Sequence, residues 1–465
     1  MTKIAKPLSL FVLVMLITGS VDSIRNLPVV ALFGSQLIFF YIFSAIVFLI
    51  PVALVSAELS STHVEHGGIF KWVSLAFGES FGFFAIWLQW INTLIWFPTV
   101  LSFLAGTLAY LVNPLLAHDK IYLILVICGT FWLLTLINLW GLKISGWVAT
   151  VATIVGMYIP MFLVFALAVL WIILGKPLQL HLTMHNLLPS FSHSQSWIAL
   201  TAIITSYLGM ELATVHVKST SDPQKMFPIA LSYSVIFILV TMILGSLSIA
   251  FVLPKDQISL VAGIMQEFTV FFQMFHMDWM TPVIVVMILI GSAGGLINWI
   301  ISPAKGLLQT AESGFLPQFF RKTNSHGVAS RILIMQAILV TLTCMVFLLM
   351  PSVNGSYWLL MDLSTQLYVL MYVIMFIAAL VLRYKFSDEP AYFKIPGGKV
   401  GIWVVCLLGL MGAGIALAIG FIPPMGINVG TAMHYEVLFL GGLLALILPA
   451  ILWILIKKKI FVNKQ

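Results

Sequence analysis

The amino-acid sequence predicts an all-α membrane protein with twelve transmembrane helices. Of its 465 residues, 61% are hydrophobic and only 8% are charged, whereas soluble domains usually carry roughly 25% charged residues. Apolar runs long enough to cross roughly 30 Å of hydrocarbon recur twelve times along the chain. These two observations exclude a water-soluble fold and predict that residues 1–465 form one polytopic membrane domain.

The predicted spans follow one another with short loops between them. The first begins after Lys3 and Lys6, a start that is also typical of a secretory signal. No small-residue cleavage site follows, so we expect this span to be retained. In order, the twelve spans cover approximately residues 8–33, 36–57, 81–112, 121–140, 144–174, 197–217, 227–252, 280–301, 332–349, 357–382, 402–422 and 435–456.

The distribution of basic residues predicts the orientation of these spans. An even number of spans puts both termini on one side, and Lys and Arg are enriched on the cytoplasmic side. With cytoplasmic termini, all 22 basic residues lie on that side except Lys120, Lys176, Lys255 and the intramembrane Arg25. The net charge of +7 then reflects anchoring to anionic lipid, not nucleic-acid binding. We expect a bacterial inner (plasma) membrane protein and leave its oligomeric state open.

Two of the spans are interrupted by polar and helix-breaking residues. The first carries Gly19, Ser20, Asp22, Ser23 and Arg25 within an apolar run, a place where ionisable side chains are rare and usually functional. The sixth carries a similar interruption, formed by Ser206, Tyr207, Gly209 and Glu211.

The two interruptions lie five spans apart, as expected of two inverted five-helix repeats that each begin with a broken helix. The repeats would cover approximately 8–174 and 197–383, followed by additional helices at 400–456. Backbone N–H groups at the start of a half-helix attract a carboxylate, and unwound carbonyls attract an ammonium group. A zwitterionic amino acid fits both. Taken singly, either break is also consistent with a close-packing glycine, and Asp22 and Arg25 are consistent either with a local ion pair or with contact between Arg25 and a substrate.

Several fragments resemble the amino acid–polyamine–organocation superfamily, and within it most closely the bacterial glutamate/γ-aminobutyrate antiporters. They comprise residues 65–73 (EHGGIFKWV), 206–217 (SYLGMELATVHV), 222–223 with Pro228, 260–266 (LVAGIMQ), 299–306 (WIISPAKG) and 393–399 (FKIPGGK). The resemblance covers nearly the whole chain. It implies a leucine-transporter-like repeat fold, alternating access and a central site lined by spans 1, 3, 6, 8 and 10.

The resemblance also implies roles for individual residues. Gly19, Ser20 and Ser23 would line the break of span 1, and Tyr207 and Gly209 that of span 6. Glu211 would be a membrane-embedded acid used in coupling or gating, and His216 would join an inner gate or lie at a helix end. Trp299 would be a movable aromatic gate, and Tyr368 and Tyr372 would face the same cavity or serve in ordinary packing.

Three features depart from those antiporters. They have an acidic residue where this chain has Gly295, and their first break lacks a pair like Asp22 and Arg25. They also carry a long cytoplasmic tail that plugs the inward path, whereas this sequence ends at Gln465. We therefore expect altered recognition at the first break and no gating by such a tail.

The function predicted from these observations is exchange of an amino acid of the glutamate, glutamine and γ-aminobutyrate group. Proton-coupled uptake through Glu211 or Asp22, and exchange of a cationic amino acid for its amine, remain open. An enzyme is not expected: His63, Glu65 and His66 lack the spacing of a zinc protease, and there is no phosphate-binding glycine loop. The three cysteines lie in apolar runs, so no metal site or cofactor is predicted.

Overall fold

The computed structural model describes residues 9–62, 68–141, 151–180, 182–189, 197–211, 222–386 and 391–462, and these residues form helices and connecting turns without a strand. The first half contains α1 (Leu10–Val21), η1 (Ile24–Asn26), α2 (Leu27–Ala31), η2 (Gly34–Gln36), α3 (Leu37–Ser44), η3 (Ala45–Leu49), α4 (Ile50–Thr62), α5 (Ile69–Phe77), α6 (Glu79–Ala109), η4 (Pro114–His118), α7 (Lys120–Leu139), η5 (Ile154–Tyr158), α9 (Ile159–Ile173) and α10 (Met184–Leu187). The second contains α12 (Ala199–Ser206), α14 (Pro223–Val252), η7 (Lys255–Gln257), α15 (Gly263–Met274), α16 (Met280–Glu312), η8 (Gln318–Arg321), α17 (Ser330–Thr343), α18 (Val346–Leu349), α19 (Val353–Lys385), α20 (Gly398–Ile419) and α21 (Ala432–Val462).

Ten helical segments of the described chain are long and apolar enough to cross a membrane. They coincide with ten of the twelve predicted spans, so the chain is a multi-pass membrane protein. Span 6 falls partly outside the described residues, and α12 is the part of it that is seen. Span 8 lies in α16, and part of it likewise falls outside the residues whose side chains are described. The count of twelve and the two inverted repeats therefore stay predictions.

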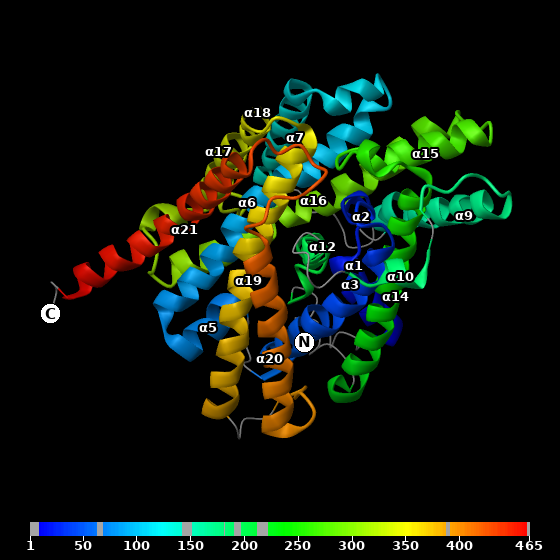
Figure 1. The fold of residues 1–465 in the computed structure, drawn as a ribbon. Helices are drawn as coiled ribbons and strands as arrows, with labels where there is room; N and C mark the ends of the chain where they lie inside the picture. The colour runs from blue at the N-terminus through cyan, green and yellow to red at the C-terminus, as the bar shows by residue number, and fades with distance from the viewer. Residues whose placement is uncertain are drawn as a thin grey trace.

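Two long helices, α6 and α19, form the centre of the bundle. They pack against each other, and α6 also contacts α5, α7, α16 and α17 (Figure 1). In the most apolar stretch of α6, 89% of the residues are buried, against 11% for α21, which projects from the edge of the molecule (Figure 1). Polar side chains on α6 and α19 are thus inside the protein, whereas α21 presents its apolar residues to lipid.

The predicted interruption of the first span is confirmed. Helix α1 ends at Val21, Asp22 and Ser23 adopt extended backbone, and helix resumes at Ile24. Short polar side chains compete for backbone hydrogen bonds, and Pro28 lacks the N–H that a continuous helix would need at this point. In the sixth span α12 ends at Ser206, and Gly209 has a φ of 95°, a conformation that a residue with a Cβ rarely adopts. Both breaks therefore follow from the local sequence.

A pair of glycines, Gly156 and Gly291, brings η5 and α16 into close contact. A Cβ on Gly156 would lie 2.3 Å from the Cα of Gly291, and a Cβ on Gly291 would lie 2.5 Å from the Cα of Gly156. Small residues allow helices in a membrane to approach closely. This crossing fixes α16 beside the breaks.

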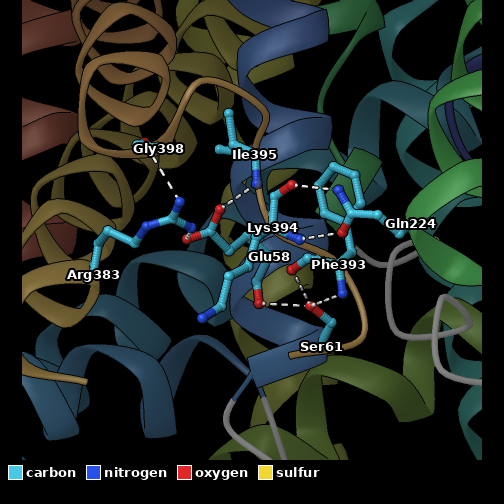
Figure 2. Close-up of polar contacts among 8 residues, drawn as sticks. All are labelled: Glu58, Ser61, Gln224, Arg383, Phe393, Lys394, Ile395 and Gly398. Carbon is cyan, nitrogen blue, oxygen red and sulfur yellow. Dashed lines mark hydrogen bonds and ion pairs between the residues drawn. The ribbon is translucent and has the colours of Figure 1, made fainter. Parts of the chain in front are cut away.

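One end of the bundle is held by a buried ion pair. Glu58, near the end of α4, accepts hydrogen bonds from Arg383 Nη1 of α19 at 2.5 Å and from the backbone N–H of Ile395 at 2.7 Å (Figure 2). The carboxylate thereby joins α4, α19 and the segment that precedes α20.

The same segment is tied a second time to α4 and also to α14, as Figure 2 shows. The Ser61 hydroxyl of α4 donates to the carbonyl of Phe393 at 2.7 Å and accepts from its N–H at 3.1 Å. The Gln224 side chain of α14 makes the corresponding pair of bonds with the backbone of Lys394, at 2.9 and 2.8 Å. We call residues 391–397 the strap, because they cross this end of the bundle.

Candidate functional site

A cavity of about 200 Å³ lies between the two helix breaks. Pockets for drug-sized ligands usually measure roughly 300–1,000 Å³, so this one suits a smaller molecule. Its walls come from the first break, α6, η5, the second break, α16 and α19. The lining residues are Gly19, Val21, Asp22, Ser23, Ile24, Arg25, Asn26, Asn92, Thr93, Trp96, Val100, Phe103, Thr153, Gly156, Met157, Thr205, Ser206, Leu208, Gly209, Gly291, Ser292, Leu296, Trp299 and Tyr368.

Asp22 and Arg25, the two charged residues of the first break, have separate partners. Asp22 Oδ2 accepts a hydrogen bond from the Thr241 hydroxyl of α14 at 2.9 Å, and Arg25 Nη1 donates to the Thr99 hydroxyl of α6 at 3.1 Å. No ion pair within 4.0 Å joins Asp22 to Arg25 in the structure. The local ion pair left open by the sequence is therefore wrong, because the extended backbone at Asp22 and Ser23 directs the two side chains toward different helices.

Aromatic rings form one wall of the cavity. The rings of Trp96 on α6 and Trp299 on α16 have their centroids 5.1 Å apart at an interplanar angle of 43°. The Arg25 guanidinium carbon lies 5.2 Å from the centre of the Trp96 ring, within the range of a cation–π interaction. Trp299 is thus in the cavity wall and in contact with a second tryptophan.

Glu211 is the centre of a polar cluster beside the second break. Its carboxylate accepts hydrogen bonds from the hydroxyls of Tyr368 and Tyr372 and, at 3.0 Å, from the side-chain amide of Gln89. The Tyr372 hydroxyl also accepts the N–H of Gly209 at 3.0 Å. The cluster therefore connects the second break with α6 and α19, and Tyr368 brings it to the cavity wall.

Most of the residues predicted for the site lie together. The cavity is lined by Gly19, Asp22, Ser23, Arg25, Ser206, Gly209, Trp299 and Tyr368, while Tyr372 and Glu211 belong to the adjoining cluster. The Ser20 side chain and His216 lie outside the described residues.

Tyr207 and Asp362 face away from the cavity. Tyr207 is fully buried, and its hydroxyl donates to the carbonyl of Tyr41 on α3 at 3.1 Å. Asp362 is bound by Tyr435 of α21 at 2.7 Å and by Gln366 at 3.0 Å. Tyr207 lies at the predicted break, but its side chain does not line the cavity as expected. The turn at residues 207–209 is not helical, so helical spacing does not predict the direction of the Tyr207 side chain.

The resemblance implied that span 3, which is α6, lines the site, but no residue of this helix was predicted to do so. Its cavity-lining residues Asn92, Trp96, Val100 and Phe103 recur every three or four positions, and Thr93 lies beside Asn92, which is the pattern of one helix face. Gln89 and Thr99, which bond Glu211 and Arg25, extend the same face. This stripe of polar and aromatic residues in an otherwise apolar span was a detectable signal.

No group of three or more His, Cys, Asp or Glu residues that could hold a metal ion occurs in the described part of the chain. Residues His63, Glu65 and His66, considered above as a zinc motif, lie outside that part.

Comparison with known proteins gives consistent matches over almost the full length. The family model for amino acid permeases matches residues 8–444. An uncharacterized transporter of Legionella pneumophila is 40% identical over 97% of both chains. A glutamate/γ-aminobutyrate antiporter of Lactococcus lactis is 31% identical over 98% of this chain and 92% of its own. A probable agmatine/putrescine antiporter of the same species is 27% identical over 94% of this chain and 90% of its own.

Proposed function

The chain belongs to the amino acid permease family, a family of transporters, and from this premise we propose that it exchanges one amino acid for another, or for a decarboxylated amine, by alternating access. The cargo belongs to the glutamate, glutamine and γ-aminobutyrate group. The observation that carries the proposal is the small cavity between two interrupted helices, which is lined in part by unwound backbone and by the charged side chains of Asp22 and Arg25.

The two ends of the bundle differ in a way that supports alternating access. At one end the strap and the Glu58–Arg383 pair tie α4, α14 and α19 together. At the opposite ends of α19 and of the α3–α4 segment lies a second cavity of about 1130 Å³, lined in part by Gly34–Gln36 of η2, Lys255 and Trp358. We infer that the described conformation is held closed at the strap end and that cargo reaches the bundle through the larger cavity.

The strap end is the cytoplasmic side in this proposal, and the membrane is a bacterial plasma membrane. The basic residues Arg383, Lys385, Lys394 and Lys399 lie at or next to the strap, and basic residues favour the cytoplasmic side. Lys255 is the basic residue in the lining of the larger cavity.

Proton-coupled uptake is the second candidate, because Asp22 has an oxygen, Oδ1, that is buried without a hydrogen-bond partner among the described residues. A carboxyl group in that position is suited to carry a proton with the cargo. A proton that crosses with the cargo would add about 2.3 kcal/mol per 100 mV of membrane potential.

Exchange in proteoliposomes tests the proposal. Vesicles loaded with unlabelled L-glutamate, L-glutamine or γ-aminobutyrate, and empty vesicles, receive labelled L-glutamate outside, with and without an imposed proton gradient and membrane potential. Antiport predicts uptake into loaded vesicles only. Uptake into empty vesicles that follows the proton gradient supports the second candidate, and absence of uptake under every condition refutes the cargo group.

A further inference from the structure

The Arg25 guanidinium is an unneutralised cation in the cavity wall. It lies where helix resumes after the first break, lines the cavity and is only 8% exposed. Arginine keeps its charge in proteins and carries five N–H donors. In this structure one side-chain hydrogen bond is made, to Thr99, and the guanidinium lies over the Trp96 ring.

Among the described residues, no acidic side chain forms an ion pair with this cation. None of the described ion pairs within 4.0 Å includes Arg25. Asp22, the nearest acid in sequence, is bonded to Thr241, and the Glu211 carboxylate is held by two tyrosines and Gln89. Thr99 is a neutral acceptor whose hydroxyl donates to the carbonyl of Trp96 at 2.7 Å.

An unpaired charge inside a protein is costly unless a partner compensates for it. The remaining donors of Arg25 suit a planar carboxylate, which guanidinium groups bind through two parallel hydrogen bonds. A diamine offers no such partner, and its ammonium groups are repelled by the guanidinium charge.

We propose that Arg25 binds the carboxylate of the cargo and is the residue that makes this chain select amino acids and reject diamines. The inference rests on the proposed function and deepens it, because the relatives include antiporters named for both classes, glutamate/γ-aminobutyrate and agmatine/putrescine. Asp22, on the other side of the break with its free Oδ1, is placed to receive the ammonium group of the same molecule. The first break then presents opposite charges to a zwitterion.

The test compares the unmodified chain with Arg25→Met, which keeps an unbranched apolar stem and removes the charge and donors of the side chain. Exchange of labelled L-glutamate and of labelled γ-aminobutyrate is measured in loaded proteoliposomes, with putrescine as competitor. The unmodified chain should exchange both amino acids and ignore putrescine. Arg25→Met should raise the half-saturating concentration of both at least tenfold, and putrescine should now compete.

Two further variants keep the result interpretable. Arg331→Met, on α17, removes an arginine that lies over the Phe319 ring outside the cavity, and it should behave like the unmodified chain. Arg25→Lys keeps the charge without the planar fork, so it should still reject putrescine while binding both amino acids more weakly. This variant carries the test if Arg25→Met fails to fold, as judged by gel filtration and thermal unfolding.

The possible outcomes separate the inference from the proposed function. Unchanged half-saturation in folded Arg25→Met, competition by putrescine in the unmodified chain, or competition by putrescine in Arg25→Lys would overturn the role of Arg25 while exchange itself stands. Failure of the unmodified chain to exchange any of the amino acids would instead refute the proposed function.

Discussion

The carboxylate of Glu211 links the second break to α6 and α19 through hydrogen bonds from three side chains. Two tyrosine hydroxyls from α19 and the Gln89 amide from α6 donate to it, and the Gly209 N–H beside it is bound to Tyr372. The three bonds to Glu211 all need an acceptor oxygen. A carboxylate offers two such oxygens, whereas a side-chain amide offers only one. The cluster must also separate when the second break moves relative to α6 and α19, as alternating access requires.

Glu211→Gln tests the role of this cluster at the scale of one residue. The carboxamide replaces one acceptor oxygen by an NH₂ group that faces a tyrosine hydroxyl, so at least one hydrogen bond is lost or reversed. Removing one charged hydrogen bond is worth roughly 1.5–3 kcal/mol. We expect the exchange rate in proteoliposomes to fall at least tenfold while the purified protein stays folded.

Glu436→Gln is the matched control for that substitution, because Glu436 is exposed on α21. It should leave the exchange rate within twofold of the unmodified chain. An equal rate for Glu211→Gln would show that the cluster has no part in transport.

At the scale of whole elements, two contacts position the helices around the cavity. The Gly156–Gly291 crossing sets the distance between η5 and α16. The Glu58–Arg383 pair and the strap set the distance between α4, α14 and α19 at the other boundary. The glycine crossing depends on the absence of side chains, so a larger residue should disrupt it. The Glu58–Arg383 contact depends on buried charge, so loss of one charge should disrupt it.

Gly291→Val tests the crossing. The added atoms would overlap the backbone of η5, where no side chain can move aside, and overpacking of this kind typically costs about 1–3 kcal/mol. We expect a lower midpoint of thermal unfolding. Gly129→Ala on α7 is the control, since a Cβ there meets nothing within 4 Å. An unchanged midpoint for Gly291→Val would mean that the two helices are not in contact.

Arg383→Met tests the ion pair. The Glu58 and Arg383 side chains are 8% and 13% exposed, and breaking a buried ion pair by removing one partner typically costs about 3–5 kcal/mol. Lys225→Met removes an exposed partner of Asp222, whose pair at 3.8 Å is worth at most about 1 kcal/mol. Thermal unfolding should separate the two variants clearly. Equal midpoints would contradict a stabilising role for the pair at the strap end.

At the scale of the whole molecule, composition and periodicity were enough to predict a multi-pass helical protein. The lengths of the apolar runs predicted ten spans that the structure contains. The break of the first span followed from Gly19, Asp22 and Pro28, because helix-breaking and polar residues act locally. Properties that depend on neighbours within a few positions are therefore readable from the sequence.

The arrangement around the breaks could not be predicted in the same way. The partners of Asp22 and Arg25 are Thr241 and Thr99, which lie far away in the chain and are brought close only by packing. The direction of Tyr207 depends on a non-helical turn whose residues do not follow the 3.6-residue period. The cavity-lining face of α6 was visible as a periodic stripe, but only the fold shows that it faces the two breaks.

If the cavity between the breaks holds the cargo, bound cargo should protect a cysteine placed in the cavity wall from labelling. In Ser292→Cys the new thiol replaces a partly buried residue of the cavity wall, and in the control Met425→Cys it lies in the larger cavity, at a position that is 73% exposed. Labelling by a small thiol reagent is followed with and without saturating L-glutamate or γ-aminobutyrate, with the unmodified chain as background for the three native cysteines.

We expect the exchanged amino acid to slow labelling of Ser292→Cys at least fivefold and to leave labelling of Met425→Cys unchanged. If Ser292→Cys exchanges the amino acid but its labelling rate does not change when the amino acid is present, the cargo binds outside this cavity.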